Sequence, residues 1–294
     1  MPRQHAGSYW SGRVPWGPAV VTIMAVILLA VFPAPLFPLA YAFQALCAQF
    51  PVVAVLTRHL PPVPISLLIS LAALALARGG VAGSGQLIRT FRFNRRIANC
   101  ARPLPARLAR GESSLDLGGR IVCLGDPSLA AFCYGFVRPR VAITTGLLER
   151  LDDEELAAVL AHERHHLRRR DPIRALMIHA FSAAAFMFPV APVVRLRLDA
   201  RLELAADRAA LTVASPGALA GALLTVLVGG EAAVVGATRL SATESRIAHL
   251  SGTPALPAIP VEATAASFGV LLVVGVATAA LALPPDLIAM VCRS

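Results

Sequence analysis

The chain has 294 residues, of which 56% are hydrophobic and 15% charged, and its formal net charge is +10. A mean hydropathy of +0.67 argues against an average soluble protein and indicates a small domain framed by membrane helices. The five cysteines are an odd number, and no pair has the spacing of metal ligands, which argues against a cysteine-based site.

The N-terminal part contains two apolar segments. We expect residues 1–17 to be a polar cytoplasmic N-terminus and residues 18–84 to hold two transmembrane helices, since each apolar stretch approaches about 20 residues. A cleaved signal peptide is the alternative for the first segment, but its apolar region exceeds the usual length of about 7–15 residues. The second span includes residues 65–77 and is expected to end at Arg78-Gly79-Gly80.

A basic juxtamembrane segment follows at residues 85–112. Its arginines are Arg89, Arg92, Arg95, Arg96, Arg102, Arg107 and Arg110. Basic residues beside a span indicate the cytoplasmic side, and we expect them to contact anionic membrane lipid. A nucleic-acid patch is the alternative reading. The segment has no helix-turn-helix signature and few aromatic residues, so no direct nucleic-acid contact is expected.

The pattern changes at about residue 113, where a domain spanning residues 113–252 is predicted. Short strands are expected at 120–124, 131–134 and 141–144, separated by turn residues such as Gly125-Asp126-Pro127. A helix is expected to begin after Asp152, because Glu155 three residues later completes a capping box.

This helix carries the motif His-Glu-x-x-His at residues 162–166. Residues four apart share a helix face, so His162 and His166 can bind one metal ion while Glu163 reaches a water on that ion. Such sites hold zinc with an open coordination position. The alternative is a solvated charged helix, since several arginines surround the motif.

A second pair, Glu203 and Asp207, is also four residues apart. Glu203 would complete a His-His-Glu zinc site, and Asp207 could hydrogen-bond the free ring nitrogen of a ligand histidine. An ordinary surface helix with ion pairs is the alternative.

The apolar stretch between the two motifs cannot cross the membrane twice. Two crossings need about 40 residues, whereas 203 − 166 leaves 37. We therefore expect an apolar helical hairpin at residues 173–200, which turns near residues 188–192 and lies in the core or dips into the membrane. A C-terminal transmembrane helix is expected at 264–291, giving three spans with the C-terminus outside.

These motifs together resemble the membrane-embedded gluzincins, and the BlaR/MecR-type group of antirepressor and sensor-transducer peptidases is the nearest match. The HtpX-like and CAAX-prenyl peptidases are similar but more distant. The resemblance covers about residues 120–250. It rests on residues 131–135, 140–143, 146–148 and 154–156, the zinc motif, Asp171, and the pair Glu203 and Asp207.

The resemblance implies an α-helical membrane protein with an embedded α+β gluzincin metallopeptidase domain. It also implies a small sheet whose edge strand pairs with an extended substrate. We assign this role to Ala131, Phe132, Cys133 and Tyr134, while a merely structural sheet is the alternative. BlaR/MecR-type sensors carry a penicillin-binding domain after the last membrane helix. We expect this chain to lack that domain and β-lactam sensing.

The sequence therefore predicts a zinc metalloendopeptidase in the cell membrane, multi-pass, with its active site facing the cytoplasm. One zinc ion per chain would be held by His162, His166 and Glu203, with Glu163 as the general base. The substrate would be a cytoplasmic or membrane-proximal protein, and the resemblance suggests a transcriptional repressor. The alternatives are a non-catalytic membrane signalling protein with a structural zinc site and a membrane-tethered nucleic-acid binder. Glu163 argues against the first, because a structural site has no use for a base.

Overall fold

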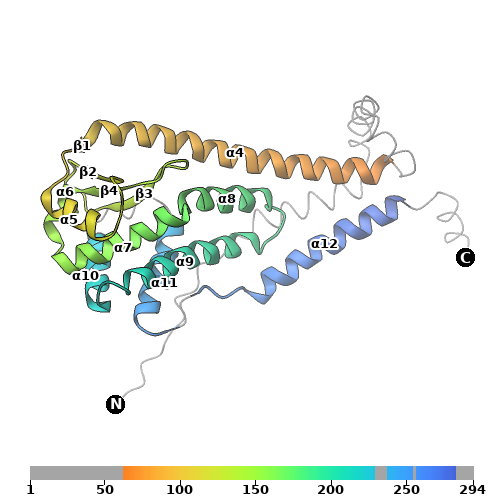
Figure 1. The fold of residues 1–294 in the computed structure, drawn as a ribbon. Coiled ribbons are helices and arrows are strands. Elements are labelled where there is room, and N and C mark those ends of the chain that lie inside the picture. Colours follow the sequence, from red (N-terminus) through yellow and green to blue (C-terminus); the bar gives the residue numbers. More distant parts are fainter. Residues whose placement is uncertain (1–61, 229–236, 254–255, 283–294) are drawn as a thin grey trace, which may run out of the picture. The chain divides into compact units, whose positions relative to one another are not determined.

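The computed structural model describes residues 62–228, 237–253 and 256–282 (Figure 1). The chain divides into two units, which we describe separately. One comprises residues 77–184 and 192–259 and contains the sheet and every candidate site residue. The other includes residues 62–76, 185–191 and 260–282. The predicted N-terminal segment 1–17, the first predicted span and the end of the last one lie outside the described residues.

A four-stranded mixed sheet lies at the centre of the first unit. Its order is β1-β2-β4-β3, with β2 and β4 parallel and both edge strands antiparallel to their neighbours. The strands are β1 (Ala101–Arg102), β2 (Ile121–Leu124), β3 (Ala131–Tyr134) and β4 (Arg140–Thr144). The three strands predicted from sequence are thus confirmed, and β3 is indeed an edge strand.

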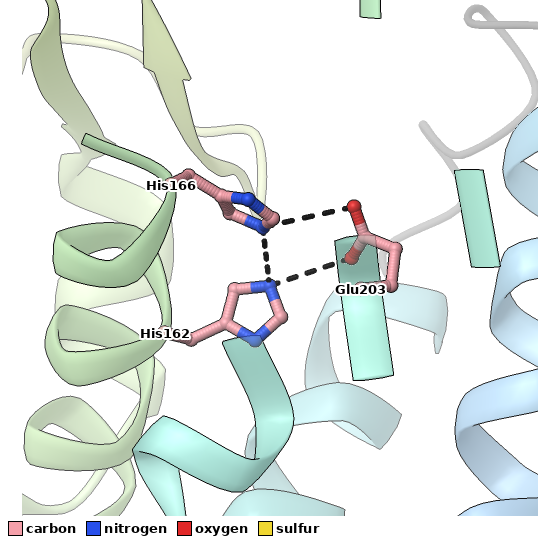
Figure 2. Close-up of side chains that lie close together, drawn as sticks. All are labelled: His162, His166 and Glu203. Carbon is pink, nitrogen blue, oxygen red and sulfur yellow. Dashed lines mark hydrogen bonds and ion pairs between the residues drawn. The ribbon is translucent and has the colours of Figure 1, made fainter. Parts of the chain in front are cut away.

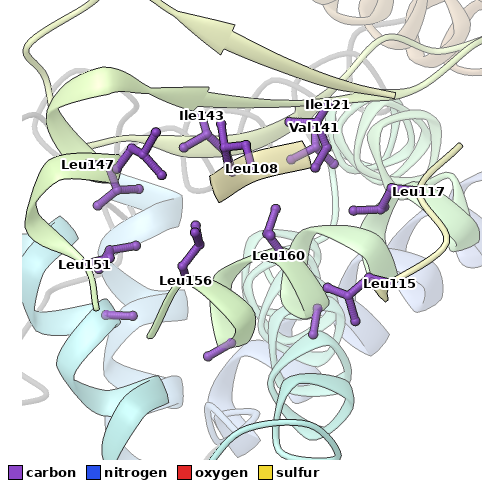
Figure 3. Close-up of a cluster of buried hydrophobic side chains, with 14 of the residues drawn as sticks. Leu108, Leu115, Leu117, Ile121, Val141, Ile143, Leu147, Leu151, Leu156 and Leu160 are labelled. Carbon is purple, nitrogen blue, oxygen red and sulfur yellow. The ribbon is translucent and has the colours of Figure 1, made fainter. Parts of the chain in front are cut away.

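One face of the sheet packs on helix α7 (Asp153–Arg169). Because side chains alternate along a strand, Ile121 of β2 and Val141 and Ile143 of β4 point to the same side (Figure 3). They meet Leu156 and Leu160 of α7 in a buried cluster. This packing fixes the orientation of the helix that carries the predicted metal motif.

Two short helices close this cluster. Helix α5 (Ala106–Ser114) contributes Leu108, and α6 (Thr145–Arg150) contributes Leu147, both fully buried. Arg107 lies within the expected lipid-facing run, yet it donates to the Asp153 carboxylate and to the carbonyls of Leu148 and Leu151. The packed domain therefore begins before residue 113, and Arg107 contacts the fold.

The opposite face of the sheet is covered by the C-terminal end of helix α4 (Pro62–Cys100). Ile97 of α4 is buried with Leu124 and Ala142, and Phe93 packs against Phe132 of β3 with ring centroids 5.4 Å apart. The sheet is thus enclosed between α7 and the end of a long helix.

Helix α4 continues through Gly79-Gly80, where the sequence predicted its end. A helical glycine costs about 1 kcal/mol relative to alanine but does not stop a helix, and no proline interrupts residues 65–100. Among the described residues, α4 provides the one helix that is long and apolar enough to cross a membrane, at Ser70–Arg95.

The predicted apolar hairpin corresponds to two helices, α8 (Asp171–Ala184) and α9 (Ala191–Ala210), connected by residues 185–190. Helices α10 (Pro216–Val228) and α11 (Ala237–Leu250) follow, and α10 packs on α7. In the other unit, α12 (Val261–Ala282) coincides with the last predicted span, although its apolar part, Val261–Val276, is shorter than a full crossing.

Candidate metal centre

Helix α7 is fixed at both ends. The Asp152 carboxylate accepts from the Glu155 backbone N–H at 2.8 Å, and the Glu155 carboxylate accepts from the Asp152 N–H at 3.0 Å. This confirms the predicted capping box. Arg170 ends the helix in the left-handed conformation at φ 55°, and Asp171 then begins α8. The turn brings Asp171 back to the last turn of α7.

The three predicted ligands converge in the structure. Figure 2 shows both imidazole rings of α7 facing the Glu203 carboxylate of α9. The Nε2 atoms of His162 and His166 are 3.1 Å apart. The Glu203 oxygens lie 3.4 Å from His162 Nε2 and 3.7 Å from His166 Nε2.

These separations fit a zinc ion. Tetrahedral ligand atoms about 2.0–2.1 Å from a common zinc are about 3.3 Å from one another, close to the three distances above. Both histidines are buried, whereas the Glu203 side chain is 31% exposed. A His-His-Glu donor set that is open on one side is typical of catalytic zinc sites, which keep one coordination position for water or substrate.

Each histidine is held from behind by a carboxylate. His162 Nδ1 lies 2.9 Å from Asp207, and His166 Nδ1 lies 2.8 Å from Asp171. Since an ionised carboxylate only accepts hydrogen bonds, each Nδ1 carries the proton and each Nε2 is left to bind a metal. The structure thus places Asp207 where the sequence predicted and adds Asp171 in the matching role.

Arg246 of α11 binds the other side of Asp207. Its Nη2 and Nε donate to the two carboxylate oxygens at 2.7 and 2.9 Å, a two-pronged contact that holds the carboxylate plane. Its Nη1 lies 3.7 Å from Glu203. Arg246 therefore links the ligand carboxylate to the carboxylate that orients His162, so α11 belongs to the site.

The charges in this cluster shift several pKa values. Burial alone would lower the pKa of His166, but the hydrogen bond to Asp171 and the charges of Glu203 and Glu163 raise it to about 9. Burial would raise the pKa of Glu203, yet the contact with His162 and the positive groups nearby hold it well below its usual range. Protons and a metal ion thus compete for His166, so metal affinity should fall as pH decreases.

Glu163 is buried next to the ligands on α7. Its Oε2 atom has no hydrogen-bond partner among the described residues. A buried carboxylate oxygen without a partner is costly and calls for an explanation. A water beside the metal position would supply the missing partner, as the motif predicts.

The predicted substrate-binding strand lies beside α7. All four of its side chains, Ala131 to Tyr134, are partly exposed. Phe132 and Tyr134 face the α4 side of the sheet. Ala131 and Cys133 face α7. Burial and the negative charges of Glu163 and Asp171 raise the pKa of Cys133, so its thiol is a neutral packing group. The outer edge of β3 is unpaired within the described sheet.

No local sequence pattern assigns a role to Arg246 or predicts the contact of Asp171 with His166. In the sequence Asp171 is part of the family resemblance only, although a carboxylate five residues after a candidate ligand is a usable signal. Arg246 lies 39 residues beyond Asp207, a separation with no local pattern. Only the packing of α11 brings it to the site.

Comparisons with known proteins agree with this geometry. Residues 106–227 match a family model described as peptidase family M48. A protease HtpX homolog of Levilactobacillus brevis is 42% identical over 67 residues, 22% of each chain. That of Acidiphilium cryptum is 34% identical over 119 residues, 39% of this chain and 38% of that protein. That of Methanopyrus kandleri is 32% identical over 117 residues, 40% of this chain and 34% of that protein.

The chain spans about two fifths or less of the length of these curated relatives. Within that range the chain is similar to peptidase family M48 and to the HtpX homologs. The matched segment 106–227 includes α7 and α9, which carry all three candidate ligands. The resemblance to the BlaR/MecR-type group remains a prediction.

Proposed function

We propose that this chain is a membrane-bound zinc endopeptidase that hydrolyses peptide bonds in a cytoplasmic or membrane-proximal protein. The observation that carries the proposal is the convergence of His162, His166 and Glu203 next to Glu163, whose buried oxygen lacks a partner. The M48 match and the HtpX homologs, which are named as proteases, support the same reaction.

His162, His166 and Glu203 would hold one zinc ion. When bound, zinc supplies a Lewis acid that lowers the pKa of a water molecule and polarises a carbonyl group. Glu163 accepts a proton from the attacking water as the water oxygen bonds to the peptide carbon. Glu163 then donates this proton to the leaving amine as the C–N bond breaks. Asp207 and Asp171 keep the two imidazoles in position throughout.

The unpaired edge of β3 offers a way to hold the substrate. An extended peptide could add to this edge as a further strand through main-chain hydrogen bonds. It would then lie next to β3, the strand that contacts α7. The proposal that the substrate is a transcriptional repressor rests on the sequence resemblance alone. The active site facing the cytoplasm rests on the arginine distribution around residues 85–112.

The test is Glu163→Gln, which preserves size and polarity but removes the basic carboxylate. General acid–base catalysis contributes about 10²–10⁴-fold, so we expect the variant to lose proteolysis by that factor. Zinc content should stay at that of the native chain, because Glu163 is not a ligand. The measurement is cleavage of an unstructured protein such as casein, or self-cleavage, at equal zinc loading.

The control is His166→Ala, which should lose zinc and activity together. A Glu163→Gln variant that cleaves as fast as the native chain would overturn the mechanism. A native chain that binds zinc but cleaves neither itself nor casein would favour the structural-zinc alternative.

A further inference from the structure

The main-chain groups at the free edge of β3 belong to Ala131 and Cys133. The Thr144 N–H donates to the carbonyl of Ala130, the residue opposite it in the antiparallel pair of β3 and β4. In such a pair, residues that bond to the neighbouring strand alternate with residues whose N–H and C=O point away from it. Phe132 therefore bonds towards β4, whereas Ala131 and Cys133 present their N–H and C=O groups to the unpaired edge.

These groups fix which side chains of an added strand would face the metal centre. A residue that bonds to Cys133 lies opposite it, so both side chains point to the same face of the sheet. That face is the α7 side, where Glu163 is close enough for its charge to raise the pKa of the Cys133 thiol. The neighbouring residue of the added strand lies opposite Phe132 and points to the other face, which α4 covers.

Helix α4 crosses this other face from one edge of the sheet to the opposite edge. Phe93 packs on Phe132 of the edge strand β3, with ring centroids 5.4 Å apart. One helical turn later, Ile97 is buried with Ala142, which pairs with Phe132 in the sheet. The helix then leads directly into β1 at the far edge (Figure 1). Since a helical turn rises about 5.4 Å and strands are about 4.8 Å apart, the turn before Phe93 extends beyond β3.

An added strand would therefore lie beneath α4 as well as beside β3. Its side chain opposite Phe132 would contact that ring, because directly opposite residues have Cβ atoms about 4.5–5.5 Å apart. Phe93 supplies a second apolar surface at the same place and is 45% exposed. Tyr134 extends the row of rings, with its centroid 6.1 Å from that of Phe132. Aromatic rings from two elements thus border one position of the added strand.

The charged groups around this position are basic. The exposed arginines there are Arg89, Arg92 and Arg95 of α4 and Arg140 of β4. They disfavour a basic side chain in the added strand. An acidic side chain would gain only an exposed ion pair, which contributes little in water. An apolar side chain would remove the exposed part of Phe93 from water, so the rings favour it most.

We propose that Phe93 of α4 and Phe132 of β3 form an apolar subsite, which selects the substrate residue next to the one bonded to Cys133. This inference deepens the proposed function and rests on it. In a substrate strand antiparallel to β3, the selected residue directly follows the one bonded to Cys133, because the two chains run in opposite directions. The substrates are extended segments with a large apolar side chain, such as that of leucine, methionine or phenylalanine, at one fixed position beside the cleaved bond.

The cleavage specificity of the full chain tests this assignment. The zinc-loaded protein in detergent digests a library of peptides, and mass spectrometry gives the residues found at each position around the cut bonds. Phe93→Ala is compared with Phe91→Ala, a matched control, because Phe91 is 56% exposed on the same helix and makes no ring contact among the described residues.

We expect the native chain and Phe91→Ala to prefer large apolar residues over serine and threonine by about five-fold at one position, the upper end for a cross-strand pair. Phe93→Ala should lose this preference, and Phe93→Leu should retain it. Phe93→Gln, which has a good helix propensity, replaces Phe93→Ala if that variant is unstable. An unchanged preference in Phe93→Ala, or a native preference for acidic residues at this position, would overturn the inference.

A binding measurement separates failure of this inference from failure of the proposed function. Glu163→Gln is titrated with short fluorescent peptides in which every second residue is either leucine or serine, and binding is followed by anisotropy. We expect the leucine peptide to bind several-fold tighter, and a second substitution, Phe93→Ala but not Phe91→Ala, to remove most of the difference. If this pattern appears while the native chain cleaves nothing, the proposed function alone fails.

Equal binding of the two peptides, or a difference that Phe93→Ala leaves unchanged, would overturn the inference. Dimers linked through Cys133 of two copies, with no peptide binding, would also overturn it and would assign the edge of β3 to a second copy of the chain.

Discussion

The imidazole rings at the metal centre are oriented by groups that do not touch the metal position. Asp207 and Asp171 fix the proton on each Nδ1, and Arg246 fixes the plane of Asp207. Glu203 and Arg246 are also close, so loss of the arginine would leave two buried or partly buried carboxylates without their counter-charge. The ligand geometry therefore depends on α8, α9 and α11 as well as on α7.

Removing one of the orienting carboxylates should weaken metal binding without removing a ligand. We expect Asp207→Asn to reduce zinc affinity about 10–100-fold, which is the usual effect of losing the partner of a ligand histidine. Asp199→Asn is the matched control on the same helix. It removes a carboxylate that pairs with Arg195 at 3.7 Å and that no hydrogen bond or ion pair of the described residues joins to either histidine. Competition with a fluorescent zinc chelator measures both, and equal affinities would contradict the orienting role.

At the scale of elements, α7 both builds the core and presents the site. Leu156 and Leu160 pack against the sheet, while His162, Glu163 and His166 on the following turns are buried at the metal centre. The helix cannot rotate to improve one set of contacts without losing the other. Loss of its N-terminal cap should therefore lower the stability of the whole unit that contains the sheet.

Asp152→Ala removes the side chain that accepts from Glu155 N–H. Loss of such a cap costs about 1 kcal/mol, so we expect the variant to unfold at a lower temperature in detergent. Asp152→Asn keeps an acceptor at this position and should retain most of the native stability. Thermal unfolding followed by circular dichroism compares the two, and similar losses in both variants would show that charge, not capping, is responsible.

On the scale of the whole molecule, the membrane-bound enzyme that we propose requires both metal motifs on one side of the membrane, because their side chains meet at one site. The apolar residues between them form two helices, and neither meets the length and hydropathy of a full crossing. Arg168 and Arg201 are exposed on the two helices that carry the ligands. Their side chains should therefore meet the same aqueous compartment as the basic segment at Arg110.

We expect Arg110→Cys, Arg168→Cys and Arg201→Cys to react with an impermeant maleimide from the cytoplasmic side only. The variants are made in a chain whose five native cysteines are replaced by alanine. Labelling is compared between intact cells and inverted membrane vesicles. If Arg168→Cys and Arg201→Cys were labelled from opposite sides, the hairpin would be a true crossing and the topology would be wrong.

The sequence by itself predicted the candidate ligands, the candidate base and the helix that carries His162, Glu163 and His166. These follow from local rules: residues four apart share a helix face, and an Asp with Glu three residues later caps a helix. The sequence also predicts the strands at 120–124, 131–134 and 141–144, because short runs with β-branched or aromatic residues are separated by turn residues, and the observed bounds differ by at most one residue. The length argument between the two motifs likewise predicted the hairpin.

Only the tertiary structure decided what depends on contacts between distant segments. Asp171 and Arg246 reach the metal centre through contacts between helices, and Arg107 bonds to groups inside the fold. Helix α4 continues through Gly79-Gly80, and Gly79 packs closely on Ala180 and Ala184 of α8. A local pattern reports the conformation of a few consecutive residues. It cannot report which arginine meets which carboxylate, because that depends on how helices pack, and packing depends on side chains from the whole unit.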